Sequence, residues 1–473
     1  MENFLENEGN IANKDISLVF VNHDGQPEKA AIESIGFSFF NNMVITLFRL
    51  IVTTNLILLG HLLYEEKVHY QLFMTFQIGV FILEFFGKYF IIGLLKYIFF
   101  QDKERKTLYN LYIKIKTALI FLIPLITVPI SLISYYILES LFTYSLKINN
   151  QDLIKEVYKK FLLFTPLIYF FEILFFLNLK YLNACNRIRL VFTYISCYLI
   201  CHIVLSWILL FILNYGVFGL TISYCLNSFL FFFFTNRRIY ITEDVDGDTF
   251  FHLIPNKNNF NGAVLKKVRE ISLYSAINLG EVFPVQFLFL VGLFIGKNEL
   301  IVNIIYLNFF ELVTEIYRGF YYTIKKELPI KYQDTIQKQN YVLFFSVYYS
   351  IISLTIFILL ILFKNILLNI YIFKGGEPAF KDIAESLRII YPLCILCMSA
   401  KLLLNGIIRS LELPVSNQRR LIYIIICVIF AYIFCFVYDL GIFGIWISML
   451  SLEFLHAGEN FAKTMKYFPF VRT

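Results

Sequence analysis

The sequence contains little charge for its length. Only 16% of its 473 residues are Asp, Glu, Lys or Arg, whereas 59% are hydrophobic and the mean hydropathy is +0.69. A soluble chain of this size would need far more charge to cover its surface. The composition therefore indicates an integral membrane protein. The net charge of +7 is spread over polar segments, which favours membrane topology over nucleic-acid binding.

Catalytic and metal-binding patterns are also scarce. The eight Cys residues lie within or at the ends of apolar segments, where small core residues are expected rather than a metal or redox site. The apolar segments show no His pair, no metal-spaced Cys and His, and no combined Ser and Lys. We therefore expect neither an enzyme nor a protein with a cofactor. The first 35 residues lack the pattern of a cleavable signal and predict a cytoplasmic tail.

Long apolar runs, in contrast, are abundant. A helix needs about 20 apolar residues to cross the hydrocarbon core. The fold class predicted is an all-α polytopic membrane protein with twelve transmembrane helices. These helices are expected at about 36–64, 70–100, 117–140, 161–182, 190–213, 215–235, 271–296, 300–324, 341–367, 386–408, 421–438 and 440–460.

A repeat divides these helices into two halves. Residues 216–223 return as residues 441–448 with five of eight positions identical, and Pro166 and Pro392 occupy matching upstream positions. The repeat predicts an N-terminal half at 36–235 and a C-terminal half at 271–460, with a linker at 236–270 and a tail at 461–473. Because each half has an even number of helices, six, both halves have the same orientation in the membrane. They are then related by a pseudo-two-fold axis along the membrane normal. Duplicated halves of this kind are typical of secondary transporters.

Lys and Arg set the expected orientation. The tail after residue 460 and the loops on the same side of the membrane as the 236–270 linker carry an excess of Lys and Arg. They hold more than twice as many of these residues as the loops on the opposite side. Cytoplasmic loops carry such an excess, so both termini are expected in the cytoplasm.

Several short segments form a recognisable set of motifs. They are Gly60-His61-Leu62, Gln101, Glu327-Leu328, Tyr181-Leu182-Asn183-Ala184, the Gly406 to Arg409 segment and Leu440 to Ile447. Together they resemble the multidrug and toxic compound extrusion (MATE) family of the multidrug/oligosaccharidyl-lipid/polysaccharide (MOP) exporter superfamily. The resemblance covers about residues 40–460, and many substitutions mark a divergent member. The resemblance implies a secondary-active antiporter for small organic molecules that exchanges protons or cations by alternating access.

Glu281 is the leading candidate for an ion site. It lies ten residues into a predicted span, near mid-membrane, and its surroundings resemble a eukaryotic Glu-Trp-Trp-x-x-Glu segment whose second Glu is Gln286 here. In the family such a glutamate binds a proton, a sodium ion or cargo. A carboxyl removed from water favours its neutral form and can exchange a proton near neutral pH, and Pro284 would free backbone carbonyls nearby. A structural, hydrogen-bonded glutamate is the alternative.

Other polar residues in the spans are weaker candidates, because a charge in the membrane needs a partner, water or a function. Steps of four and three residues place Glu311, Glu315 and Arg318 on one helix face, either as a neutralised stripe or in contact with cargo. His202 is expected to be a satisfied core residue rather than a proton relay. The remaining candidates are Arg49 and Glu172, which would face each other or the cavity, and Asn55, Asn278 and Asn308, which would be cavity donors or helix-packing residues.

One position departs from the family pattern. Members with an acid in the tenth span place it where this chain has Met398, and Lys401 is the nearest charge. This substitution leaves both the coupling ion, proton or sodium, and a preference for organic cations open.

A flippase for lipid-linked or amphipathic cargo is the alternative function, and a scaffold that has lost transport is a third. The expected partners are the cargo, the ion and the bilayer, with the protein acting as a monomer in the plasma membrane or an internal membrane.

Overall fold

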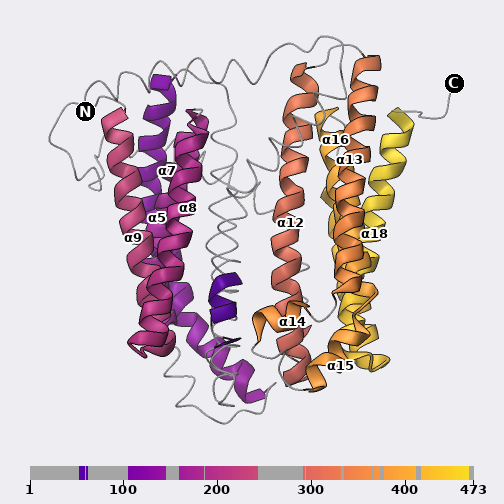
Figure 1. The fold of residues 1–473 in the computed structure, drawn as a ribbon, viewed down its shortest axis with the longest axis horizontal. Coiled ribbons are helices and arrows are strands. Elements are labelled where there is room, and N and C mark those ends of the chain that lie inside the picture. Colours follow the sequence, from indigo (N-terminus) through magenta and orange to yellow (C-terminus); the bar gives the residue numbers. More distant parts are fainter. Residues whose placement is uncertain are drawn as a thin grey trace.

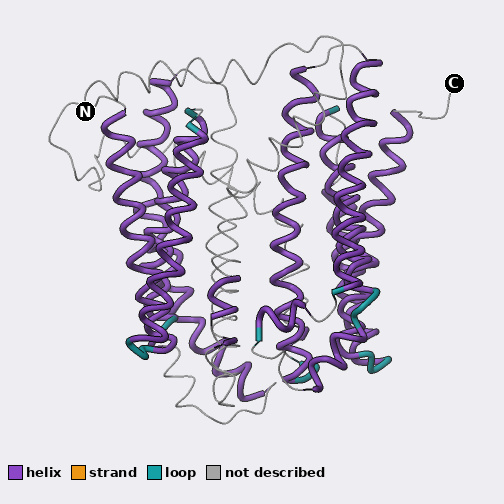
Figure 2. The backbone as a smooth tube through the Cα atoms, viewed as in Figure 1, coloured by secondary structure: helices purple, strands orange, loops and turns teal. Residues whose placement is uncertain are grey.

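A computed structural model describes most of the predicted spans. Within the described part of the chain every regular element is a helix and no strand occurs (Figure 2). The described residues are 53–58, 60, 61, 105–144, 159–185, 187–242, 291, 292, 294–331, 335–363, 366–372, 378–411 and 417–467.

The long helices form two bundles (Figure 1). Helices of the first bundle pack chiefly against one another, and so do those of the second. The first bundle consists of α5 (Arg105–Tyr144), α7 (Thr165–Ala184), α8 (Ile188–Trp207) and α9 (Gly216–Thr242). The second consists of α12 (Lys297–Lys331), α13 (Thr335–Leu362), α16 (Ile390–Ser410), α17 (Asn417–Tyr432) and α18 (Gly441–Tyr467).

Two short helices lie at one end of the second bundle (Figure 1). They are α14 (Ile366–Tyr371) and α15 (Pro378–Ser386), and both contact α12. Eight of the described helices are long and apolar enough to cross a membrane. Large apolar side chains such as Leu125, Ile351 and Leu362 remain exposed on them, as expected for a surface that faces lipid. The chain is an integral, multi-pass membrane protein.

The helix boundaries correct several of the predicted spans. Helix α5 begins at Arg105 rather than near 117, α9 continues to Thr242 into the predicted linker, and α18 reaches Tyr467 in the predicted tail. The predicted span 386–408 starts in a break, since α15 ends at Ser386 and α16 begins at Ile390. Hydropathy marks only the apolar part of a helix, and polar turns continue it beyond the lipid.

The sequence repeat forms the same local structure twice. The helix before each copy of the repeat ends in a π-helical segment. This segment is Ile208–Ile212 after α8 and Ile433–Val437 after α17. Backbone bonds from Tyr215 N to the Leu209 carbonyl and from Leu440 N to the Phe434 carbonyl, both 3.0 Å, follow it.

The chain then turns into α9 and α18 through left-handed backbone. Asn214 and Asp439 have φ angles of 54° and 52°, and Gly216 and Gly441 have 56° and 53°. Glycine adopts this conformation without a steric cost, and Asn and Asp tolerate it better than other residues. The prediction that the repeated segments begin a helix is confirmed at both sites.

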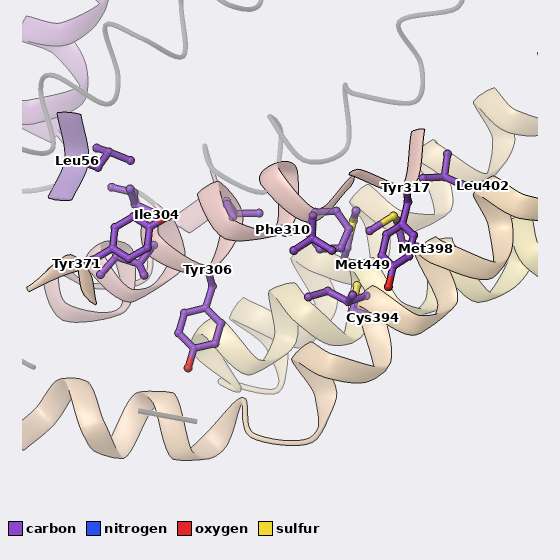
Figure 3. Close-up of a cluster of buried hydrophobic side chains, with 14 of the residues drawn as sticks. Leu56, Ile304, Tyr306, Phe310, Tyr317, Tyr371, Cys394, Met398, Leu402 and Met449 are labelled. Carbon is purple, nitrogen blue, oxygen red and sulfur yellow. The ribbon is translucent and has the colours of Figure 1, made fainter. Parts of the chain in front are cut away.

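The second bundle holds a large apolar core. Figure 3 shows part of it, including Tyr306, Phe310, Met398 and Met449. Leu56, from the first predicted span, belongs to the same buried cluster (Figure 3). The cluster also includes first-bundle residues such as Tyr112 and Phe175, so the apolar core is not confined to the second bundle.

Candidate functional site

The described part of the first predicted span, residues 53–58, 60 and 61, connects the two bundles. We call it the first-span segment. It lies between them beside α14 (Figure 1). Thr53 and Asn55 are both buried, and they form hydrogen bonds to opposite bundles. The two residues lie within one turn of the same helical segment. This short stretch of backbone therefore makes a polar contact with each bundle.

On the side of the first bundle, Asn55 contacts His202 of α8. The Nε2 atom of the His202 ring lies 2.7 Å from Asn55 Oδ1, and its Nδ1 atom lies 3.2 Å from Ser223 Oγ on α9. Ser206 Oγ lies 2.5 Å from Ser223 Oγ. These four side chains are fully buried, and three helical segments contribute them. We call them the His202 network.

The donors in this network follow from its acceptors. Asn55 Oδ1 can only accept, so Nε2 carries the hydrogen and donates. Nδ1 of a neutral imidazole then accepts from the Ser223 hydroxyl, which in turn accepts from Ser206. Asn55 Nδ2 is buried and has no hydrogen-bond partner among the described residues.

A carboxylate lies next to the network. Tyr224 donates a hydrogen bond of 2.9 Å to Glu172 Oε1, and its ring centroid is 5.4 Å from that of His202. Glu172 is 2% exposed, so the Tyr224 hydroxyl compensates for part of its lost hydration. The structure therefore places Asn55, a predicted site residue, in contact with the imidazole, and Glu172, another, beside the Tyr224 ring that neighbours it.

On the side of the second bundle, Thr53 forms a second polar cluster. Thr53 Oγ1 donates to Asn308 Oδ1 over 2.9 Å, and the Tyr371 hydroxyl donates to the same oxygen over 2.7 Å. Burial raises the pKa of the Tyr371 hydroxyl, so it remains a donor at physiological pH. This cluster joins the first-span segment to α12 and α14.

The end of the first-span segment tightens the same contact. His61 Nε2 lies 2.9 Å from the Ile370 carbonyl, to which it donates. A Cβ atom on Gly60 would lie 2.0 Å from the Tyr371 carbonyl oxygen, so only glycine permits this approach. We call Thr53, Gly60 and His61, with Asn308 and Tyr371, the latch.

The predicted polar stripe of α12 contains an ion pair. Arg318 and Glu315 form an ion pair on α12, and both are mostly buried. Glu311, one turn earlier, is half-buried. The stripe therefore carries a charge pair and one further carboxylate.

Lys401 does not add an isolated cation to this bundle. Its Nζ atom lies 2.7 Å from Glu453 Oε2 and 2.9 Å from Oε1, and the two side chains are 8% and 2% exposed. Met398 is buried in the apolar core (Figure 3). Glu453, on α18, supplies the carboxylate that faces Lys401, and the sequence comparison with the family did not identify it.

Four of the predicted site residues, Arg49, Asn278, Glu281 and Gln286, lie outside the described residues. Of the latch residues, Asn308 was a predicted site residue, and Gly60 and His61 belong to a motif that resembles the family. Thr53, Tyr371, Ser206 and Ser223 were missed. The repeat offers one signal for the His202 network. At the same offset that relates Gly216 to Gly441, His202 corresponds to Cys427, and Ser223 corresponds to Ser448. Only the first bundle has an imidazole at this position.

Solved structures that share this fold are membrane transporters. No protein-family model and no curated protein sequence matches the chain. The eukaryotic MATE transporter AtDTX14 aligns with a TM-score of 0.69 and 16% identity over 93% of this chain and 95% of that chain. A MOP-superfamily transporter from Pyrococcus furiosus, described as having a binding pocket of reverse polarity, aligns with a TM-score of 0.65 and 16% identity over 93% and 96%. An outward-facing multidrug resistance MATE family transporter aligns with a TM-score of 0.63 and 16% identity, over 93% of this chain and 96% of that chain.

The chain therefore has the MATE transporter fold over almost its whole length. The resemblance predicted from short motifs is confirmed for the fold, and the 16% identity is that of a divergent sequence.

Proposed function

We propose that this protein is a secondary-active transporter that exports small organic molecules by alternating access, in exchange for protons or cations. The observation that carries the proposal is the match to MATE transporters over 93% of the chain. The polar contacts of the first-span segment with both bundles support it, since alternating access requires contacts that form and break between two bodies.

The proposed architecture extends the described helices. Eight helices that could cross a membrane, and the shorter apolar segment Ile422–Val437, each overlap a predicted span. Twelve spans in two six-helix halves, related by a pseudo-two-fold along the membrane normal, complete this arrangement. Residues 236–270 would tether the halves in the cytoplasm together with both termini, and the protein would act as a monomer.

The proposed ion site centres on Glu281. A mid-membrane carboxylate can hold a proton or a sodium ion, and Asn278 and Gln286 would supply polar groups near it. Arg49, Asn55, Glu172 and the α12 stripe of Glu311, Glu315 and Arg318 would contact cargo or tune the charge of the pathway. No cofactor and no enzymatic step is needed for exchange driven by an ion gradient.

A flippase for lipid-linked or amphipathic cargo is the second candidate. Arg318 and Lys401 show that this chain places cations as well as carboxylates within its spans, each beside an acidic partner. Such a mixture suits a zwitterionic or anionic headgroup better than a purely acidic pathway does. A scaffold without transport activity is the third candidate.

Flux into proteoliposomes distinguishes the three candidates. Purified protein would be reconstituted with an imposed pH or sodium gradient. Ethidium would serve as the cationic probe, carboxyfluorescein as the anionic probe, and a fluorescent phospholipid would report flipping. Gradient-dependent flux of either soluble probe supports the exporter. Lipid translocation alone would favour the flippase. Flux no faster than in protein-free liposomes, for every probe, would favour the scaffold.

A further inference from the structure

One end of the first bundle concentrates arginine. Residues 187–242, which include α8 and α9, contain no Asp or Glu and four Arg, namely Arg187, Arg189, Arg237 and Arg238. All four lie where α8 begins and α9 ends. Arg189 and Arg237 are exposed, and they lie at or near the ends of the apolar spans Arg189–Ile212 and Phe218–Ile241. This charge therefore lies where the spans leave the hydrocarbon core.

The register of the two helices brings these ends together. α8 and α9 pack against each other in opposite directions, and the contacts of Tyr198 fix their register. Its hydroxyl lies 2.9 Å from Ser228 Oγ, and its carbonyl accepts a hydrogen bond of 2.9 Å from Asn227. Arg189 is nine residues before Tyr198, and Arg237 is nine residues after Ser228. The two arginines therefore lie at the same level, on packed helices whose axes are typically about 8–10 Å apart.

Mainly apolar side chains continue each arginine into the span. On α8 the exposed residues after Arg189 include Thr193, Cys197, Ile200 and Val204. On α9 the exposed residues before Arg237 include Phe234, Leu230 and Leu226. Steps of three and four residues place each series on one face of its helix. Each exposed arginine thus stands at the end of an exposed, mainly apolar helix face.

The second bundle differs at the equivalent positions. At the offset of the repeat, Lys463 takes the place of Arg238, and Glu459 takes the place of Phe234. Lys463 Nζ lies 2.7 Å from Glu459 Oε1, so this cation has a carboxylate on its own helix. Arg237 has no cationic counterpart. A helix end built on the same repeat therefore packs without an exposed arginine, which favours a role for Arg237 beyond packing.

Arginine at this level suits the phosphate of a membrane lipid. A guanidinium presents its N–H donors in a plane and can bind phosphate through two parallel hydrogen bonds. The cytoplasmic leaflet carries the anionic lipids, and basic groups between transmembrane helices near that surface bind acidic headgroups. The orientation proposed above puts this end of the first bundle on the cytoplasmic side. A zwitterionic lipid offers the same phosphate, but its own cation would be repelled by the arginines.

We propose that the ends of α8 and α9 form a binding site for an acidic phospholipid of the cytoplasmic leaflet. Arg189 and Arg237 bind its phosphate, Arg187 and Arg238 add positive charge around it, and its acyl chains lie along the exposed faces of the two helices. None of these residues belongs to the proposed ion and cargo sites. Only the choice of leaflet rests on the orientation proposed for transport.

Lipid binding to the full chain in detergent tests the proposal. Native mass spectrometry would compare dioleoylphosphatidylglycerol with dioleoylphosphatidylcholine, without cargo. We expect the acidic lipid to bind about tenfold more tightly, and Arg189→Gln/Arg237→Gln to remove most of this preference. Equal affinity of the wild type for both lipids would overturn the proposal. It would favour the acidic segment 243–248, which follows α9 in the sequence, as the partner of the arginines.

A matched variant separates the site from net charge. Arg388→Gln/Lys463→Gln also removes two positive charges, but at residues that each pair with a nearby glutamate. It should keep the preference of the wild type. A loss as large as that in Arg189→Gln/Arg237→Gln would show that net charge alone attracts the lipid and would overturn the site. Melting temperatures close to that of the wild type would check that both variants fold.

Inorganic phosphate distinguishes a lipid site from a general anion site. Phosphate in molar excess should leave the lipid bound, because it cannot replace the contacts of the acyl chains. Displacement of the lipid by phosphate would overturn the assignment. Because these measurements use neither cargo nor an ion gradient, their failure would leave the flux experiment, and hence the proposed function, untouched.

Discussion

Several buried charged side chains in the described part of the protein bond to other side chains. Lys401 pairs with Glu453, Arg318 with Glu315, and Glu172 accepts from Tyr224. A charge in a membrane span is costly, and pairing lowers that cost more than distance from lipid alone does. Two of these contacts, Lys401 with Glu453 and Glu172 with Tyr224, join different helices. Glu281 remains the proposed site at which charge is exchanged.

Breaking the Lys401 pair should destabilise the protein strongly. Lys401→Met leaves the Glu453 carboxylate buried without its cation, which we expect to cost about 3–5 kcal/mol. The double variant Lys401→Met/Glu453→Gln removes both charges and should recover most of that loss. Thermal unfolding in detergent measures both. Equal destabilisation in the single and double variants would show that the pair itself contributes little.

At the scale of the element, the repeated turn determines where the last helix of each bundle begins. A Cβ on Gly444 would lie 2.8 Å from Cys435 N and from Phe434 C, and one on Gly219 would lie 3.0 Å from the Leu209 carbonyl oxygen. These glycines let the new helix cross close to the π-helical end of the preceding one. The close approach explains why the repeat retains glycine at both positions.

Gly444→Ala should therefore weaken the second bundle. The added methyl meets backbone rather than a flexible side chain, and overpacking of this kind costs about 1–3 kcal/mol. Gly458→Ala, in the same helix with open space around it, is the control and should be neutral or slightly stabilising, because alanine favours helices. Melting temperatures of the two variants in one detergent make the comparison. A Gly444→Ala protein as stable as the control would contradict the packing account.

The sequence predicted elements better than it predicted contacts. The repeated segment at 216 and 441 marks two helix starts correctly, because left-handed glycine and close packing leave a local signature. Hydropathy predicted the apolar helices that the structure describes but missed the polar start of α5 at Arg105. Helix α14 has only six residues and is too short to be predicted as a span. The sequence did not pair Lys401 with Glu453, because the two residues are distant in sequence. Thr53 and Asn308, 255 residues apart, gave no local signal at all.

At the scale of the whole molecule, the two bundles are joined in the described structure through the first-span segment. The helices of each bundle otherwise pack chiefly within their own bundle. Leu56 of this segment belongs to a buried apolar cluster that includes residues of both bundles, so rocking of one bundle against the other would have to open contacts at this segment. The proposed alternating access is the functional counterpart of this arrangement.

Severing the predicted linker tests the independence of the halves. We expect that cutting the chain between residues 243 and 270 and co-expressing the two parts would preserve assembly and most of the flux, because the linker is proposed to be a tether. Co-purification of the parts checks assembly, and probe flux checks activity. A correctly assembled pair with no flux would mean that the linker takes part in gating.

Flux driven by a proton gradient, compared between the wild type and Glu281→Gln in proteoliposomes, tests the central claim of coupled transport most directly. The substitution keeps the size of the side chain and removes its titration, so it should abolish gradient-driven flux of the probe while the melting temperature stays close to that of the wild type. The chain has Met398 where family members carry a second acid, so Glu281 alone would bind the coupling ion. We therefore expect cargo to be exchanged for protons. Unchanged flux in Glu281→Gln, or flux that follows a sodium gradient and ignores pH, would contradict the account.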